Sequence, residues 1–278
     1  MPRGTTAPRQ RPFCSDVARE NGEPLAGTAS RIDHWLLVEY RGLWGPNAIR
    51  ASGLSDQVKR TLREQVAARP HTRLLFIRRP DRRGRPEFRA YGGTSIEGEE
   101  SLRSVAFEAH DDLRDLDLMT AGDPIDQPLF LVCTHGKHDP CCARYGRPLF
   151  EALSEQVEEE AVWQVTHIGG DRFAGNLVCL PHGVYYGRVE RELAGDVLDN
   201  HLAGQVELPH YRGRSCHPFA AQAAERDVRE HRRPTLELGL GVEVAERAQL
   251  VDLPVEDRPS RRDELRAHAP THVVRAEP

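Results

Sequence analysis

The chain has 278 residues, 38% of them hydrophobic, so it is long enough to bury a sizeable core in one large domain or two smaller ones. Its 38 basic residues are outnumbered by 43 acidic ones and are spread throughout, which gives a net charge of −5 and argues against nucleic acid or an anionic membrane as a partner. The opening stretch MPRGTTAPRQRP lacks the apolar core of a secretory signal, and no run approaches the roughly 20 apolar residues of a membrane span. We therefore expect a cytoplasmic protein.

The first predicted elements follow a polar amino terminus (residues 1–12) that we expect to be disordered. HWLLVEY (34–40) is predicted to be a buried strand, and TRLLFIRR (72–79) a second one. The order strand, helix, strand is typical of an α/β layer. Between the two strands, Ser55 or Asp56 is placed to cap a helix whose apolar residues recur at helical spacing, namely Val58, Leu62 and Val66.

The second half contains a dense cluster, CTHGKHDPCC (133–142), which holds three of the six cysteines of the chain. The preceding segment PLFLV (128–132) is a predicted strand, so Cys133 lies at a strand's carboxyl end, where open α/β sheets usually carry out chemistry. Six cysteines, only half of them clustered, do not make a disulfide framework in a chain of this length. The cluster indicates metal-binding or redox-active thiols, with a structural coincidence as the remaining interpretation.

Four further elements are predicted after the cluster. Residues 147–160 have the apolar spacing of a helix with an acidic, exposed end. WQVTHIGGD (163–171) is predicted to be a strand that runs into a glycine turn, and NLVCLPHGVYYGRV (176–189) a β-hairpin. This order is compatible with a thioredoxin-like layer. A last helix is marked by Leu193, Val197, Leu198 and Leu202.

Three stretches of the chain resemble the sucrase/ferredoxin-like family: CTHGKHDPCCARYGRPL, HIGGDRFAGNLVCLPHGVYYGRV and YRGRSCHPFAAQAAE. The resemblance covers most of the chain, including EPLAGTA and WLLVEYRGLWG near the amino end. It implies an α/β fold in which a thioredoxin-like ferredoxin domain (126–232) follows a smaller or similar α/β half (13–125). Residues 233–278 are then a carboxyl-terminal extension that we expect to be partly flexible.

The same resemblance implies a ligand set for a 2Fe-2S cluster. Family members that carry the cluster hold it with two cysteines nine positions apart and with two histidines in an H-x-G-G-H motif. At these positions the present chain has Cys133, Cys142 and His167, but Asp171 takes the place of the second histidine. Asp171 is expected either to be the fourth ligand, which would lower the reduction potential, or to form the turn after the glycines. Other residues that could fill this place, without matching the motif, are Cys141, Cys179 and His182.

The function that follows from this set is electron transfer to or from an unidentified redox protein, a reductase or an acceptor. Two alternatives stay open: a zinc-binding protein, since two cysteines, one histidine and one aspartate also suit tetrahedral zinc, and a metal-free thioredoxin-like thiol protein. The thiol protein is disfavoured because the chain lacks a C-x-x-C motif. A hydrolase is disfavoured because no recognisable pair of carboxylates is present. Cys14 and Cys216 are expected to be ordinary thiols, and His135 and His138 to lie near the site without binding metal.

Overall fold

The computed structural model describes residues 12–79, 85–158 and 160–231. The predicted disordered amino terminus, apart from Pro12, and the predicted extension (233–278) lie outside these residues.

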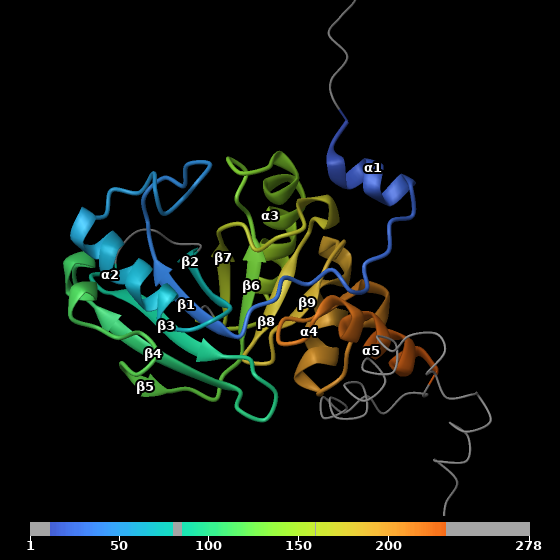
Figure 1. Ribbon diagram of the computed structural model, residues 1–278. Coiled ribbons are helices and arrows are strands. Elements are labelled where there is room, and N and C mark those ends of the chain that lie inside the picture. Colours follow the sequence, from blue (N-terminus) through green and yellow to red (C-terminus); the bar gives the residue numbers. More distant parts are fainter. Residues whose placement is uncertain (1–11, 80–84, 159, 232–278) are drawn as a thin grey trace, which may run out of the picture.

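The described residues form helices on the outside of one sheet (Figure 1). The α-helices are α1 (Cys14–Glu20), α2 (Asp56–Ala67), α3 (Pro140–Ser154), α4 (Ala194–Leu202) and α5 (Phe219–His231). The strands are β1 (His34–Glu39), β2 (Thr72–Arg78), β3 (Phe88–Thr94), β4 (Ser101–Phe107), β5 (Asp123–Pro124), β6 (Leu129–Cys133), β7 (Val162–Val165), β8 (Leu177–Leu180), β9 (Val184–Tyr186) and β10 (Tyr211–Arg214). Short 3-10 helices are η1 (His110–Arg114), η2 (Asp171–Phe173), η3 (Arg191–Leu193) and η4 (Leu208–His210).

The sheet has ten strands in the order β10-β9-β8-β6-β7-β2-β1-β3-β4-β5, and its two halves repeat one another. In the second half β6 and β7 are parallel, whereas β8 and β9 add antiparallel strands on the other side of β6. In the first half β1 and β2 are parallel, and β3 and β4 add antiparallel strands in the same way. This is the strand order of a thioredoxin-like layer, so the predicted α/β fold class is confirmed.

The two halves join through the antiparallel pair β2 and β7, in which Ile77 lies opposite Val165 and Arg78 opposite Gln164. Because equivalent strands pair across this seam, the sheet runs without interruption from one half into the other. The predicted division into domains at residues 125 and 126 falls in the connection from β5, at the edge of the first half, to β6, inside the second half. Its status as a domain boundary stays a prediction.

The sheet curls strongly around a shared core. Five strand steps separate β9 from β1, which would be about 24 Å in a flat sheet. The rings of Trp35 on β1 and Tyr185 on β9 nevertheless lie 6.3 Å apart, centroid to centroid. The indole nitrogen of Trp35 donates to the Ser95 hydroxyl at 2.8 Å, and that hydroxyl donates to the carbonyl of Pro181 in the second half. Both halves therefore fill one interior, while α2 covers the outside of the first half and α3 and α4 cover the second.

The helix predicted to begin after Ser55 or Asp56 is confirmed as α2. Ser55 is the N-cap residue of α2, and its hydroxyl accepts from the backbone nitrogen of Val58 at 3.4 Å. Val58 and Leu62 are buried against the sheet, and Val66 packs beside them. The two predicted strands at 34–40 and 72–79 also agree with β1 and β2 within a residue.

The helix of the second half differs from its prediction at both ends. It begins at Pro140, not at residue 147, because the Asp139 carboxylate caps it by accepting from the Cys141 nitrogen at 2.7 Å and Pro140 suits the first turn. It ends at Ser154, before the acidic stretch. As a result Cys142 lies in the first helical turn of α3, beside the end of β6.

The helix α3 can approach β6 closely because residue 146 is glycine. A Cβ atom at Gly146 would lie 2.0 Å from the carbonyl oxygen of Cys133, a backbone atom that cannot move aside without moving the strand. Close packing at this point sets the distance between the helix and the strand that carry the two cysteines.

We predict that Gly146→Ala destabilises the fold by about 1–3 kcal/mol, because the added methyl group overpacks the contact between α3 and β6. Gly195→Ala is the matched control, since the atom nearest to a Cβ there is the flexible end of Gln156, 2.9 Å away, and alanine favours a helix. Urea unfolding of both variants measures the difference. Equal stability of the two variants would contradict the close contact.

Candidate metal centre

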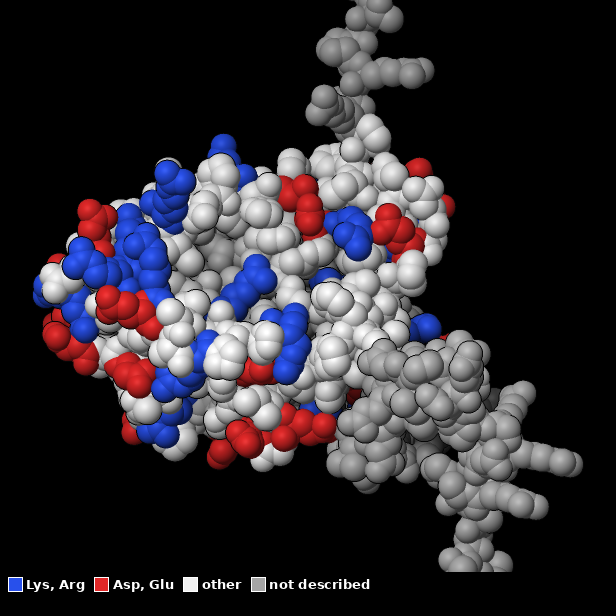
Figure 2. Space-filling view, viewed as in Figure 1, with Lys and Arg blue, Asp and Glu red and all other residues white. Residues whose placement is uncertain are grey.

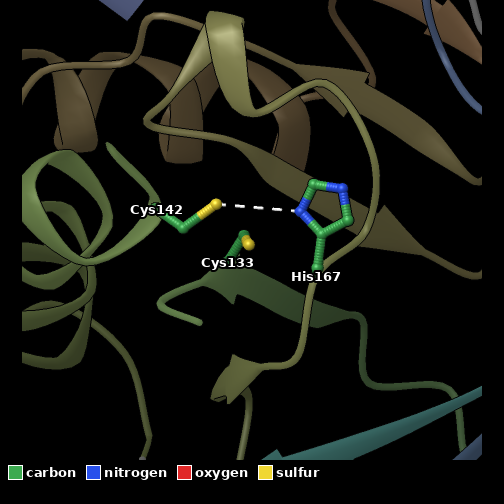
Figure 3. Close-up of side chains that lie close together, drawn as sticks. All are labelled: Cys133, Cys142 and His167. Carbon is green, nitrogen blue, oxygen red and sulfur yellow. Dashed lines mark hydrogen bonds between the residues drawn. The ribbon is translucent and has the colours of Figure 1, made fainter. Parts of the chain in front are cut away.

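Three predicted ligands converge between a strand, a helix and a loop. Cys133 is the last residue of β6, Cys142 lies in the first turn of α3, and His167 follows β7. The two sulfur atoms and a ring nitrogen of His167 all lie within 4.8 Å of one another, and Cys142 Sγ is 3.7 Å from His167 Nδ1. Figure 3 shows the three side chains pointing toward one another. Both cysteines are buried, whereas His167 is half-buried, so the imidazole lies on the solvent side of the group.

The thiols of Cys133 and Cys142 are coupled through a hydrogen bond. The hydrogen bond with Cys142 lowers the pKa of Cys133 well below its ordinary value, against the effect of burial, and His167 contributes in the same direction. The same bond raises the pKa of Cys142, as does burial. The hydrogen bond thus favours ionisation of Cys133 over that of Cys142, and the thiolate is the form of cysteine that binds metals.

Two further histidines support His167. The backbone nitrogen of His167 donates to His135 Nδ1 at 3.3 Å, and His135 Nε2 lies 2.8 Å from the carbonyl oxygen of Gly45. These partners require the His135 tautomer with its proton on Nε2. Burial lowers the pKa of His135, which keeps the ring neutral. The exposed ring of His138 stacks on that of His167 with centroids 3.8 Å apart. Both residues lie near the site, as expected.

The glycine turn after His167 is held by a buried arginine and an asparagine. The Asn176 amide donates to the carbonyl of Gly170 at 2.7 Å and accepts from Arg212 Nη1 at 2.8 Å. Arg212 also donates to the carbonyl of Gly169 at 3.1 Å and to both oxygens of Thr28. Gly170 has a φ of 77°, and a Cβ there would meet the Arg212 guanidinium at 2.3 Å. Arg212 was not singled out from the sequence, because nothing in YRGR distinguishes it from its neighbour Arg214.

Asp171 lies outside the compact group of three. It begins η2, and its carboxyl group forms a hydrogen bond with the Asp139 side chain. Its charge raises the pKa of Cys142, so it lies within the electrostatic reach of the site. Among the described residues, the group that contains Cys133 and Cys142 and has its ligand atoms within 4.8 Å of one another is completed by His167 and does not include Asp171. The role of Asp171 as fourth ligand stays a prediction.

The remaining cysteines separate into two kinds. Cys179 is buried on β8 in the core beside α3, and burial raises its pKa well above the ordinary value. Cys216 is half-buried and lies outside the group formed by Cys133, Cys142 and His167. Cys14 and Cys141 were not predicted to meet, but their sulfur atoms lie 3.3 Å apart. No signal in the sequence links these two residues, which are 127 positions apart.

The strand order and the buried group of two thiols and an imidazole define a thioredoxin-like α/β protein with a candidate site for a thiophilic metal centre. The chain belongs to the sucrase/ferredoxin-like family, whose model matches residues 25–213. This match confirms the resemblance inferred from the motifs. Within the described residues, no helix combines the length and the apolar character needed to span a membrane, and the expected cytoplasmic location stays a prediction.

Yeast relatives match the chain over a limited segment. The chain is 34% identical over 100 residues to "Altered inheritance of mitochondria protein 32" of Meyerozyma guilliermondii. The matched segment covers 32% of this chain and 35% of the relative. The protein of the same name from Debaryomyces hansenii is 31% identical over 99 residues, covering 32% of this chain and 36% of the relative. The match thus spans about a third of the length of these relatives.

Solved structures of a thioredoxin-like [2Fe-2S] ferredoxin from Aquifex aeolicus are also similar. The wild-type protein at 1.5 Å resolution is 20% identical, with a TM-score of 0.28, and the match covers 31% of this chain and 97% of that chain. A further structure of that ferredoxin is 19% identical with a TM-score of 0.29, covering 31% of this chain and 91% of the other. Scores this low carry no argument about the site.

We predict that Asn176→Ala destabilises the protein by about 2–3 kcal/mol, because it leaves the buried Arg212 guanidinium with one acceptor fewer and frees the carbonyl of Gly170. Asn200→Ala is the control, since the Asn200 amide donates to Glu207 away from the site. Chemical unfolding gives the free energies, and the ring-proton NMR signals of His167 report the turn. A His167 signal unchanged by Asn176→Ala would show that the asparagine does not position the turn.

Proposed function

We propose that this chain is an electron-transfer protein that holds a 2Fe-2S cluster on Cys133, Cys142, His167 and Asp171. The observation that carries the proposal is the convergence of two buried thiols and an imidazole at the carboxyl end of β6. Such a cluster stores and releases single electrons. The protein acts here as a redox carrier and not as a hydrolase.

The donor set suits this group chemically. Thiolates are the ligands that iron-sulfur clusters use most, and imidazole replaces them in mixed centres of higher potential. The hydrogen bond with Cys142 and the neighbouring His167 both lower the pKa of Cys133, which favours the thiolate form that binds iron. The buried cysteine side excludes water, whereas His167 and the stacked ring of His138 lie toward solvent. This arrangement gives a partner protein its shortest approach on the histidine side.

The partner is proposed to be a redox protein, and the surface beside the site suits such a contact. A cavity of about 820 Å³ adjoins the loop that follows Cys133, lined on one side by His135 and Lys137 and on the other by Trp44. Basic and acidic side chains are interspersed over the face in Figure 2, without one sign covering it. Mixed charge of this kind favours a protein partner over nucleic acid.

A single zinc ion at the same residues is the second candidate function. The three ligand atoms lie within 4.8 Å of one another, which also suits one tetrahedral ion with three protein ligands. A thiol enzyme is less well supported, because the Cys133 and Cys142 side chains are 1% and 0% exposed and cannot reach a protein disulfide.

Iron, zinc and acid-labile sulfide, measured on anaerobically purified protein, distinguish these functions. We predict about two irons and two sulfides per chain with visible charge-transfer absorption, and loss of both in Cys133→Ser and in Cys142→Ser. Cys216→Ser is the matched control and keeps the full content, because Cys216 lies outside the group. Zinc without sulfide would replace the ferredoxin function with the zinc function, and a colourless, folded, metal-free protein would exclude both.

We predict that Asp171→His makes the cluster more durable and raises its reduction potential. The imidazole would complete the family ligand pattern and would remove a negative charge from the ligand set. The measurements are the rate of bleaching in air and the midpoint potential from redox titration. Asp196→His, on the exposed first turn of α4, is the control for a surface histidine. An Asp171→His protein with the parent's iron content, bleaching rate and potential would remove Asp171 from the ligand set.

A further inference from the structure

A second group of metal-binding side chains lies outside the site described above. It consists of Cys14 at the start of α1, Asp139 as the N-cap residue of α3, and Cys141 in the first turn of α3. One ligand atom from each lies within 4.8 Å of the others. This group shares no residue with Cys133, Cys142 and His167, although Cys141 and Cys142 are neighbours in the chain. Two elements far apart in sequence therefore meet through two thiols and a carboxylate.

We propose that this group binds one divalent thiophilic cation of the Zn²⁺ type, with the two sulfur atoms, one oxygen of Asp139 and a water molecule as its four ligands. Three protein ligands and an open fourth position are an established arrangement for zinc. The exposed position of Cys14 leaves that fourth position accessible to solvent.

The distances between the donor atoms lie within about half an ångström of those around such an ion. Bonds of about 2.3 Å to sulfur and about 2.1 Å to oxygen, in tetrahedral geometry, separate the donors by about 3.5–3.8 Å. Here Cys14 Sγ lies 3.3 Å from Cys141 Sγ and 3.8 Å from Asp139 Oδ2. Both cysteines are free thiols in the structure.

The two oxygens of Asp139 have different tasks. Oδ1 accepts from the Cys141 backbone nitrogen at 2.7 Å, which fixes the orientation of the carboxylate. Oδ2 is then directed at Cys14 Sγ. The helix cap thus orients one oxygen toward the centre of the group, as supporting hydrogen bonds commonly do for metal ligands.

The charges of the group also favour a cation. Burial, the neighbouring Cys141 thiol, and the carboxylates of Asp139 and Asp171 together raise the pKa of Cys14 to about 12. Asp139 is in turn in hydrogen-bonding contact with Asp171. A divalent ion would offset these negative charges, and it would fasten α1 to α3 next to the first site. Figure 1 shows α1 beyond one end of the sheet, on the same side as α3.

Cobalt titration of the full-length, untagged chain tests the proposal. The Cys133→Ser, Cys142→Ser double variant removes both sulfurs of the first site, and Co²⁺ is the probe because thiolate ligation gives it charge-transfer absorption. We expect one Co²⁺ per chain in this variant, displaced by Zn²⁺, and loss of that ion when Cys14→Ser is added. Adding Cys216→Ser instead is the control and retains the ion. A folded double variant that binds no Co²⁺, or binds it equally with and without Cys14, overturns the proposal.

Alkylation of the unmodified protein provides a second test that needs no variant to fold. We expect Zn²⁺ to slow the reaction of Cys14 with iodoacetamide at least tenfold and a chelator to restore it, with the reaction of Cys216 unchanged, as read from peptide masses. The proposal is overturned if Zn²⁺ leaves the alkylation rate of Cys14 unchanged. It is also overturned if peptide masses show that Cys14 and Cys141 form a disulfide in the protein as purified. Cys14→Ser alone leaves iron and sulfide at the first site, so failure here is distinct from failure of the ferredoxin function.

Discussion

The buried guanidinium of Arg212 is the interaction on which the candidate site depends. Its side chain is 1% exposed, and burial lowers its pKa to about 10, which still leaves it charged at neutral pH. A buried charge is tolerated only when its donors are satisfied, and here the acceptors come from the segment around Thr28, the glycine turn and Asn176. The same hydrogen bonds that satisfy the arginine therefore hold the turn that carries His167 and Asp171.

The repeated strand order shows that the fold alone does not make the site. Cys133 ends β6, and the residue that ends β1 in the first half is Glu39. Glu39 is 1% exposed and forms ion pairs with Arg41 at 2.9 Å and Arg79 at 3.3 Å. The same position in the strand order is thus occupied by a buried ion pair in one half and by a thiol in the other. Chemistry at this position follows from the side chains that occupy it.

Local patterns predicted most elements because their causes are local. The helix after Ser55 and the hairpin that turns at residues 181–183 follow from capping, apolar spacing and turn residues close together in the chain. The start of α3 was predicted too late, because the capping role of Asp139 within the CTHGKHDPCC stretch was not recognised. The meeting of Cys133, Cys142 and His167 was implied by the family resemblance, whereas the supporting roles of Arg212 and Thr28 were not predicted.

The sequence by itself determined the α/β class, the family, and which residues could bind a soft metal, because these follow from periodicity and from residue types at short spacing. Only the tertiary structure decided that the halves join at β2 and β7 and curl around one core. It also decided that Asp171 contacts Asp139 and that Cys14 meets Cys141. These contacts depend on how distant segments pack, and a chain contains no local pattern for the partner of a residue more than a hundred positions away.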